Sequence, residues 1–219
     1  LFRSGLALAP TRLRPLSVEH PKMEDRSRRR PPAPGCGLDS VEEGGACRPV
    51  VVANVRDEQV NFPSSIPDKG LAALRGTLSV PDAPGKRPAV ILLHGSGPQD
   101  RDEGIDLAPN KRYRIFRTLA DSLARRGIAV LRMDDRGVGA SQGDFDTATT
   151  EDFAADVQAG LAYLRTRPEI DGRRLGVVGH SEGGYVAPIL AAREPELRAI
   201  VLLAGPAVGA RPILEFQLA

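Results

Sequence analysis

A serine flanked by glycines lies between an apolar strand and an apolar helix start in residues 175–192, LGVVGHSEGGYVAPILAA. Gly179, Ser181 and Gly183 match the pattern Gly-x-Ser-x-Gly, in which a sharp turn from a strand into a helix exposes a serine hydroxyl. Side chains at the two glycine positions would clash with the neighbouring strand and helix, because the backbone around such a serine is strained. The start of a helix also favours developing negative charge. The pattern predicts that Ser181 is a nucleophile in acyl transfer.

The same pattern occurs a second time at Gly139-Ala140-Ser141-Gln142-Gly143, in a chain that contains 23 glycines. Its surroundings differ, because Ser141 lies in a polar, glycine-rich stretch that does not lead directly into a helix. We therefore interpret Ser141 as a turn serine that hydrogen-bonds the backbone of its own loop. Ser181 remains the candidate nucleophile.

A serine that attacks a carbonyl needs hydrogen-bond donors for the oxyanion that forms. The N–H group of the residue after the nucleophile, Glu182, is expected to be one donor. The main-chain N–H of Ser96 is the candidate for the second, because Gly95 and Gly97 let the backbone after the apolar run AVILL approach a substrate carbonyl. The alternative interpretation of this run is an ordinary glycine turn at the end of a strand.

No residue of this chain is an obvious general base for the serine. His20 lies in a low-complexity segment, His94 is expected to brace the loop that follows it, and His180 adjoins the nucleophile and should point away from its hydroxyl. Contact with substrate is one interpretation of the charged residues 100–103, DRDE, but ion pairs within their own loop are the preferred one. Residues 134–136, DDR, are interpreted as a structural network within their loop.

The base and its acidic partner normally follow the serine in hydrolases that use this turn. Only 38 residues follow Ser181, and none of them is a histidine. We therefore expect the last strands of the fold to be missing from this chain. The chain alone is predicted to be inactive, because a serine without a base is a poor nucleophile at neutral pH. If further strands pack beyond residues 199–203, that strand becomes an exposed apolar edge that favours aggregation.

Composition excludes several classes of function. Residues 1–49 carry nine Lys and Arg against six Asp and Glu, whereas the remaining residues carry 21 and 22. A nearly neutral body without tryptophan argues against a nucleic-acid partner. No stretch is long enough for a membrane span, and no set of residues has the spacing of a metal site. The sequence implies no cofactor and leaves the oligomeric state open.

Residues 1–49 are rich in Arg, Pro and Gly and are predicted to be a disordered leader. Cys36 and Cys47 both lie in this segment. They form a disulfide if the protein is exported, but two unpaired thiols is the preferred interpretation. The sequence therefore slightly favours a cytoplasmic location, with export open if a signal was lost upstream.

From residue 50 onward, strands alternate with helices. Two antiparallel strands are predicted at residues 50–60 and 71–80, and buried parallel strands at residues 87–94, 128–133, 175–178 and 199–203. Amphipathic helices are predicted at residues 113–126, ended by Gly127, and at residues 149–167, where Thr149 and Asp152 form a capping box. This order predicts a three-layer α/β/α sandwich with a mostly parallel sheet over residues 50–219.

Taken together, the motifs GHSEGG, HGSGPQDRDE and MDDRGVGASQGDF resemble those of the α/β-hydrolases. The chain is similar to bacterial serine esterases of the dienelactone-hydrolase-like and acyl-peptidase-like branches. The resemblance covers residues 55–219 and implies a carboxylesterase that acts on a small-molecule ester through an acyl-serine intermediate. Two alternatives stay open, namely a serine peptidase of the same fold that acts on short peptides and a non-catalytic binding module.

Overall fold

The computed structural model describes residues 40–43, 46–49, 54–108, 111–209, 211–212 and 215. The chain divides into two units, Leu1–Arg48 and Pro49–Ala219. A two-stranded sheet pairs β1 (Ser40–Glu43) with β2 (Ala46–Pro49). These strands fall within the segment for which the sequence predicts disorder. The rest of that segment, including Cys36, lies outside the described residues, so the disorder stays a prediction.

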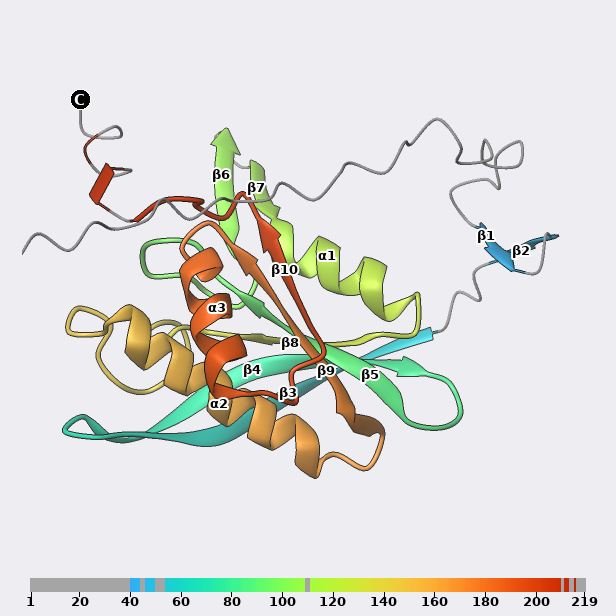
Figure 1. The fold of residues 1–219 in the computed structure, drawn as a ribbon, viewed down its shortest axis with the longest axis horizontal. Helices are drawn as coiled ribbons and strands as arrows, with labels where there is room; N and C mark the ends of the chain where they lie inside the picture. Colours follow the sequence, from blue (N-terminus) through green and yellow to red (C-terminus); the bar gives the residue numbers. More distant parts are fainter. Residues whose placement is uncertain are drawn as a thin grey trace, which may run out of the picture. The chain divides into compact units, whose positions relative to one another are not determined.

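The second unit is built on a six-stranded sheet with the strand order β10-β9-β5-β8-β4-β3 (Figure 1). The strands are β3 (Asn54–Ile66), β4 (Gly70–Asp82), β5 (Arg87–Leu93), β8 (Ala129–Met133), β9 (Ile170–His180) and β10 (Ala199–Leu203). β10, β9, β5 and β8 run parallel, whereas β4 is antiparallel to both β8 and β3. The predicted mostly parallel sheet is confirmed.

Helices cover both faces of this sheet. α2 (Thr150–Thr166) and α3 (Gly183–Arg193) pack on one face, and α1 (Ile115–Ala124) packs on the other. Successive side chains of a strand point to opposite faces of the sheet, as two neighbours in β8 show. Leu131 packs in the core beneath α2 and α3, whereas Val130 packs in the core beneath α1. Burial on both faces explains the continuous apolar runs of the central strands.

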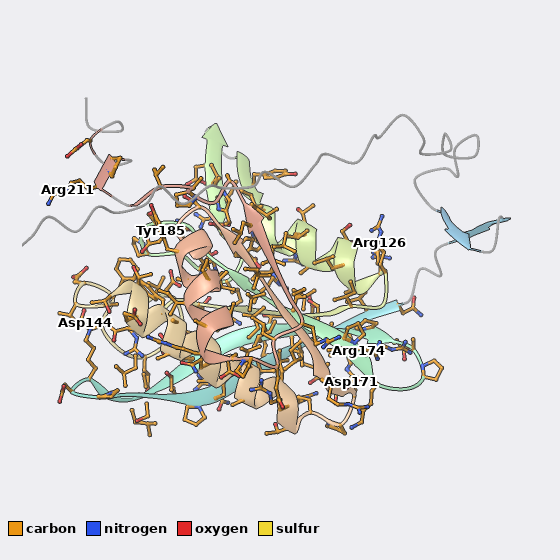
Figure 2. The ribbon with its side chains drawn as sticks, in the orientation of Figure 1. Arg126, Asp144, Asp171, Arg174, Tyr185 and Arg211 are labelled. Carbon is orange, nitrogen blue, oxygen red and sulfur yellow. The ribbon has the colours of Figure 1, made fainter. Side chains whose placement is uncertain are left out.

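Several charged side chains lie at the surface of this unit. Arg126, Asp144 and Arg174 are exposed and project away from the sheet (Figure 2). Among the described helices, none combines the length and apolar character that crossing a membrane requires.

Two local predictions need correction. Between the strand predicted to end at residue 94 and the helix predicted to begin at residue 113, the sequence predicts only a loop, but this segment contains the hairpin of β6 (Gly104–Ala108) and β7 (Lys111–Arg114), which pair antiparallel. The pairing places Ile105 opposite Tyr113, two half-exposed apolar side chains whose contact is compatible with a small ribbon on the surface. Because β7 occupies residues 111–114, the following helix begins at Ile115 rather than at residue 113.

The start of α2 confirms the predicted capping box. The Thr149 hydroxyl accepts a hydrogen bond from the Asp152 N–H at 3.3 Å, and the Asp152 carboxylate accepts one from the Thr149 N–H at 2.8 Å. Lys69, in the turn between β3 and β4, also donates to this carboxylate. Burial raises the pKa of Asp152, but the hydrogen bonds from Lys69 and Thr149 outweigh it and lower the pKa to about 2.

We predict that Asp152→Asn destabilises the fold at pH 7 by about 1–2 kcal/mol and flattens its acid sensitivity. Because the folded pKa is depressed, this contribution is present above the unfolded pKa of about 3.9 and is lost as the pH falls toward 2. Urea unfolding from pH 2 to 7 tests this against Asp82→Asn, a change at an exposed carboxylate. Equal differences from wild type at pH 2 and pH 7 would contradict the prediction.

β10 presents an apolar edge. It pairs with β9 on one side, and no described strand pairs with its other side. Ile200, Val201 and Leu202 are 40%, 46% and 46% exposed, unlike the fully covered residues of the central strands. Unpaired backbone groups beside exposed apolar side chains favour pairing with another chain.

We predict that the 219-residue chain self-associates and that Val201→Lys reduces this association, because a charge on an edge strand opposes strand pairing. Light scattering as a function of concentration provides the measurement. Leu71→Lys is the matched control, since Leu71 is 73% exposed but lies near the turn between β3 and β4. A monomeric wild-type chain, or equal effects of the two substitutions, would contradict the prediction that association occurs through β10.

Candidate active site

Ser181 lies at the sharp turn between β9 and α3. Its backbone has φ of +49°, a left-handed conformation that costs on the order of 1–3 kcal/mol for a non-glycine residue. The Ser181 N–H donates to the carbonyl oxygen of Leu203, at the end of β10, over 2.9 Å. The turn is thus held at the carboxyl edge of the parallel strands, and the serine side chain is half-buried.

The two glycines of the pattern have the steric role that the sequence predicts. A Cβ atom at Gly179 would overlap the carbonyl group of Gly183, in the first turn of α3. A Cβ atom at Gly183 would lie 2.6 Å from the carbonyl oxygen of Leu93, in β5. Only glycine lets helix and strand approach this closely on either side of Ser181.

The loop after β5 lies against this turn. The Gly183 N–H donates to the carbonyl oxygen of His94 over 2.9 Å. A Cβ atom at Gly95 would lie 3.2 Å from the Cβ atom of Ser181, which shows how closely the loop passes the serine. The proposed donors Ser96 and Glu182 therefore come from the two segments next to Ser181. No described residue accepts a hydrogen bond from either N–H group.

Gly97 follows Ser96 in a left-handed conformation, with φ of +92°. A residue with a side chain would be strained there, which explains why position 97 is a glycine. The loop is also fixed further on, where the Gln99 N–H donates to the carboxylate of Asp135 over 3.1 Å.

The two described histidines each bind a carboxylate. His94 Nδ1 lies 2.9 Å from Asp135 Oδ1, and its ring stacks on Phe116 with centroids 5.1 Å apart. His180 Nδ1 lies 2.8 Å from Glu103 Oε1. No described residue forms a hydrogen bond with the hydroxyl of Ser181. The bracing role expected of His94 fits its contact with Asp135, which also holds the Gln99 N–H.

The charged loops differ in detail from the sequence prediction. Residues 100–103 were expected to pair internally, but their charged side chains reach other elements: Asp100 to Arg112, Arg101 to Asp134, Asp102 to Arg132 and Glu103 to His180. The reason is topological, because the partners lie in other elements, namely β7, β8 and the residue after it, and the end of β9. Glu103 was assigned only to an ion pair within its own loop, since nothing in the sequence places it beside His180.

Residues 134–136 do not form one network but separate contacts. Asp134 binds Arg101 at 2.6 Å, and Arg136 binds Asp156 of α2 at 2.6 Å in the interior. Burial raises the pKa of Asp134, but hydrogen bonds from Arg101 and from the Ala140 N–H hold it below its ordinary value. These groups fix the loop after β8 to its neighbours on both sides.

Ser141, in the second glycine–serine match, is buried and bonded to main-chain atoms. Its hydroxyl donates to the carbonyl oxygen of Asp134 over 2.9 Å and accepts from the Arg75 N–H over 2.9 Å. Asp134 belongs to the same loop, as the turn-serine interpretation requires, and Arg75 belongs to β4. A hydroxyl committed in this way is not presented to a substrate.

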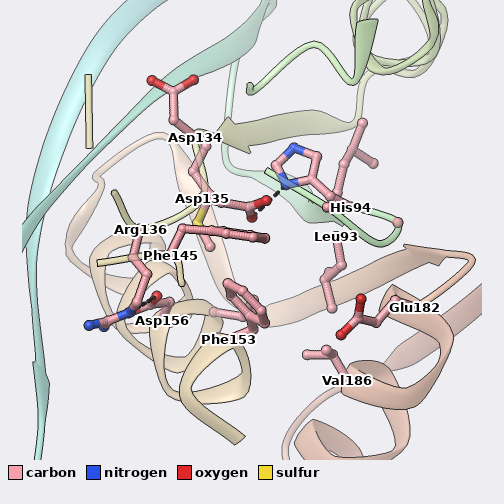
Figure 3. Close-up of a pocket in the computed structure, with 15 residues that line it drawn as sticks. Leu93, His94, Asp134, Asp135, Arg136, Phe145, Phe153, Asp156, Glu182 and Val186 are labelled. Carbon is pink, nitrogen blue, oxygen red and sulfur yellow. Dashed lines mark hydrogen bonds and ion pairs between the residues drawn. The ribbon is translucent and has the colours of Figure 1, made fainter. Parts of the chain in front are cut away.

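A cavity of about 40 Å³ is lined by Glu182, one of the candidate donors, and by Gly95 and Gly97, which flank Ser96 (Figure 3). Glu182 and Val186 of the α3 start form one side, and Phe145 and Phe153 form an apolar wall opposite. The cavity also reaches Gly95 and other residues at the ends of β5 and β8. Within the described residues, no group of three or more His, Cys, Asp or Glu side chains is placed to hold a metal ion.

Comparison with known proteins finds similar sequences and similar folds. Residues 110–218 match the family described as serine aminopeptidase, S33. The esterase EstD of Thermotoga maritima is 35% identical over 159 residues, which cover 71% of this chain and 36% of EstD. Esterase FrsA of Vibrio vulnificus is 35% identical over 104 residues, 47% of this chain and 24% of FrsA. The chain therefore matches only about a quarter to a third of the length of these relatives.

Solved structures agree on the fold. The α/β-hydrolase GrgF from Penicillium sp. sh18 matches with a TM-score of 0.55 at 24% identity, over 74% of this chain and 53% of GrgF. With these matches, the chain has the fold of the α/β-hydrolases. Its relatives by sequence include proteins named as esterases.

We predict that Gly179→Ala destabilises the chain by about 1–3 kcal/mol, because the added methyl group pushes the start of α3 away from β9. Urea unfolding provides the measurement. Gly209→Ala is the control, since a Cβ atom there meets nothing within 4 Å. Equal stabilities of the two variants would contradict the steric role of Gly179.

Proposed function

We propose that the protein containing this chain hydrolyses small carboxylic esters through an acyl-serine intermediate on Ser181. The observation that carries the proposal is the strained turn at Ser181 packed against the loop of residues 94–97, with two N–H groups that no described residue uses. The esterase names of the relatives EstD and FrsA support the choice of an ester substrate. The proposed chemistry needs no cofactor.

In the first half-reaction, the Ser181 oxygen attacks the ester carbonyl and loses its proton to a general base. The N–H groups of Ser96 and Glu182 stabilise the oxyanion of the tetrahedral intermediate. The C–O bond to the alcohol then breaks, and the base returns the proton to the departing alcohol. In the second half-reaction, water attacks the acyl-serine and releases the acid and the free serine.

We place the base outside the described residues. His94 and His180 both use Nδ1 to bind carboxylates, and neither forms a hydrogen bond with Ser181. The resemblance to serine esterases implies an acid and a histidine from later strands of the longer protein. On this proposal the 219-residue chain alone turns over esters slowly.

We place the acyl group of the ester in the cavity beside Glu182. Its apolar wall of Phe145 and Phe153 suits a hydrocarbon group, and its volume of about 40 Å³ favours a small one. An acetyl ester is therefore the first substrate to test.

A serine peptidase of the same fold is the second candidate. The observation that favours it is the match of residues 110–218 to a family described as serine aminopeptidase. Both candidates use the same serine and oxyanion donors, so turnover of an ester compared with an aminoacyl amide distinguishes them. A non-catalytic binding module is the third alternative, and it predicts an inert serine.

We predict that the full-length protein hydrolyses p-nitrophenyl acetate and reacts with a fluorophosphonate, and that Ser181→Ala abolishes both. The serine oxygen is the attacking atom, so its removal lowers kcat by roughly 10⁶-fold if Ser181 resembles other activated serines. Mass spectrometry of the labelled protein locates the adduct.

Ser141→Ala is the matched control, because Ser141 lies in the same sequence pattern but is buried. The Ser141→Ala protein should still be labelled by the fluorophosphonate at Ser181. Labelling at another residue, or full turnover by Ser181→Ala, would refute the assignment. Turnover of the aminoacyl amide in preference to the ester would favour the peptidase.

A further inference from the structure

Glu103 is a buried carboxylate at the centre of the site that the proposed reaction does not use. Its residue is 3% exposed, in the short link between the loop after β5 and the strand β6. Glu103 Oε1 accepts a hydrogen bond from the Gly95 N–H over 2.7 Å and lies 2.8 Å from His180 Nδ1. One oxygen atom therefore connects the loop of the proposed oxyanion donor to the residue before Ser181.

The peptide unit between His94 and Gly95 is held from both sides. Its carbonyl oxygen accepts from the Gly183 N–H over 2.9 Å, and its N–H donates to Glu103. The next N–H along the chain is that of Ser96. Because a peptide unit is planar, fixing both of its polar groups fixes its orientation, so that only the φ and ψ angles of Gly95 remain to set the direction of the Ser96 N–H.

The second contact of Glu103 acts on the serine side. Through His180 Nδ1 it restrains the residue that enters the turn at Ser181. An atom built at the Cβ position of Gly95 would lie 3.2 Å from Glu103 Oε1 and 3.2 Å from the Cβ atom of Ser181. Gly95 therefore lies between the carboxylate of Glu103 and the side chain of Ser181 and is close to both.

This arrangement is costly for folding alone. Glu103 has φ of +47°, a conformation that disfavours residues with side chains, and its second oxygen, Oε2, is buried without a described partner. Both costs are concentrated beside Ser181. Strained and poorly compensated groups of this kind cluster where geometry must be fixed for function.

We propose that Glu103 is a positioning residue that holds the Ser96 N–H and the turn at Ser181 in the relative positions that stabilise the oxyanion. The inference rests on the proposed function and deepens it. Glu103 does not touch the reacting atoms but acts through Gly95 and His180. Its contribution is therefore to the transition state, in which the oxyanion forms, rather than to substrate binding.

The test compares Glu103→Ala and Glu103→Gln in the full-length protein, with p-nitrophenyl acetate as substrate. Glu103→Ala loses both contacts, so kcat should fall by about 100-fold while KM changes less than about 3-fold. Glu103→Gln keeps an oxygen for the Gly95 N–H, so its loss in kcat should be smaller, between about 3- and 10-fold. Asp106→Asn, at a carboxylate that is 71% exposed in β6, is the control with unchanged kinetics.

Thermal unfolding of each variant separates positioning from loss of fold. If Glu103→Ala does not fold, the folded Glu103→Gln decides, and its kcat must fall by at least about 3-fold for the proposal to stand. Unchanged kcat, or a higher KM at constant kcat, overturns the role of Glu103 while Ser181→Ala still reports on the nucleophile. A wild-type protein with an inert Ser181 overturns the proposed function and this role with it.

Discussion

The close backbone contact between the first turn of α3 and the end of β5 is the constraint on which the site depends. The Gly183 N–H donates to the carbonyl oxygen of His94, and a Cβ atom at Gly183 would lie 2.6 Å from the carbonyl oxygen of Leu93. This contact sets the distance between the helix that follows Ser181 and the loop that carries Ser96. A larger residue at position 183 would separate the nucleophile from its proposed oxyanion donor.

The sheet makes this contact possible. β5 and β9 are parallel neighbours at its centre, so their carboxyl ends meet at one edge, and β10 holds the turn through the bond from the Ser181 N–H to the Leu203 carbonyl. Catalytic and binding groups of open α/β sheets occur at this edge for the same reason. The site is therefore assembled from backbone groups of three adjacent strands, and Glu103 adds a side-chain tie across them.

The sequence predicts the backbone features of the site but not the hydrogen bonds that its side chains form. Apolar runs and glycine positions were sufficient to locate the strands of the six-stranded sheet, the turn at Ser181 and the loop at Ser96, because each depends on local pattern. The partners of Glu103 could not be predicted, because His180 is 77 residues away in the chain and only the folded sheet brings the two together. The hairpin of β6 and β7 left only a weak signal, the apolar Ile105 and Leu107 on either side of Asp106, within a segment that otherwise resembles a loop.

A crystal structure of the full-length protein after reaction with a fluorophosphonate tests the central claim most directly, because the adduct mimics the tetrahedral intermediate. The expected result is a bond from phosphorus to the Ser181 oxygen, with the phosphoryl oxygen about 2.7–3.1 Å from the backbone nitrogens of both Ser96 and Glu182. An adduct on another residue would contradict the assignment of the nucleophile. An adduct on Ser181 whose phosphoryl oxygen contacts neither nitrogen would contradict the assignment of the oxyanion donors.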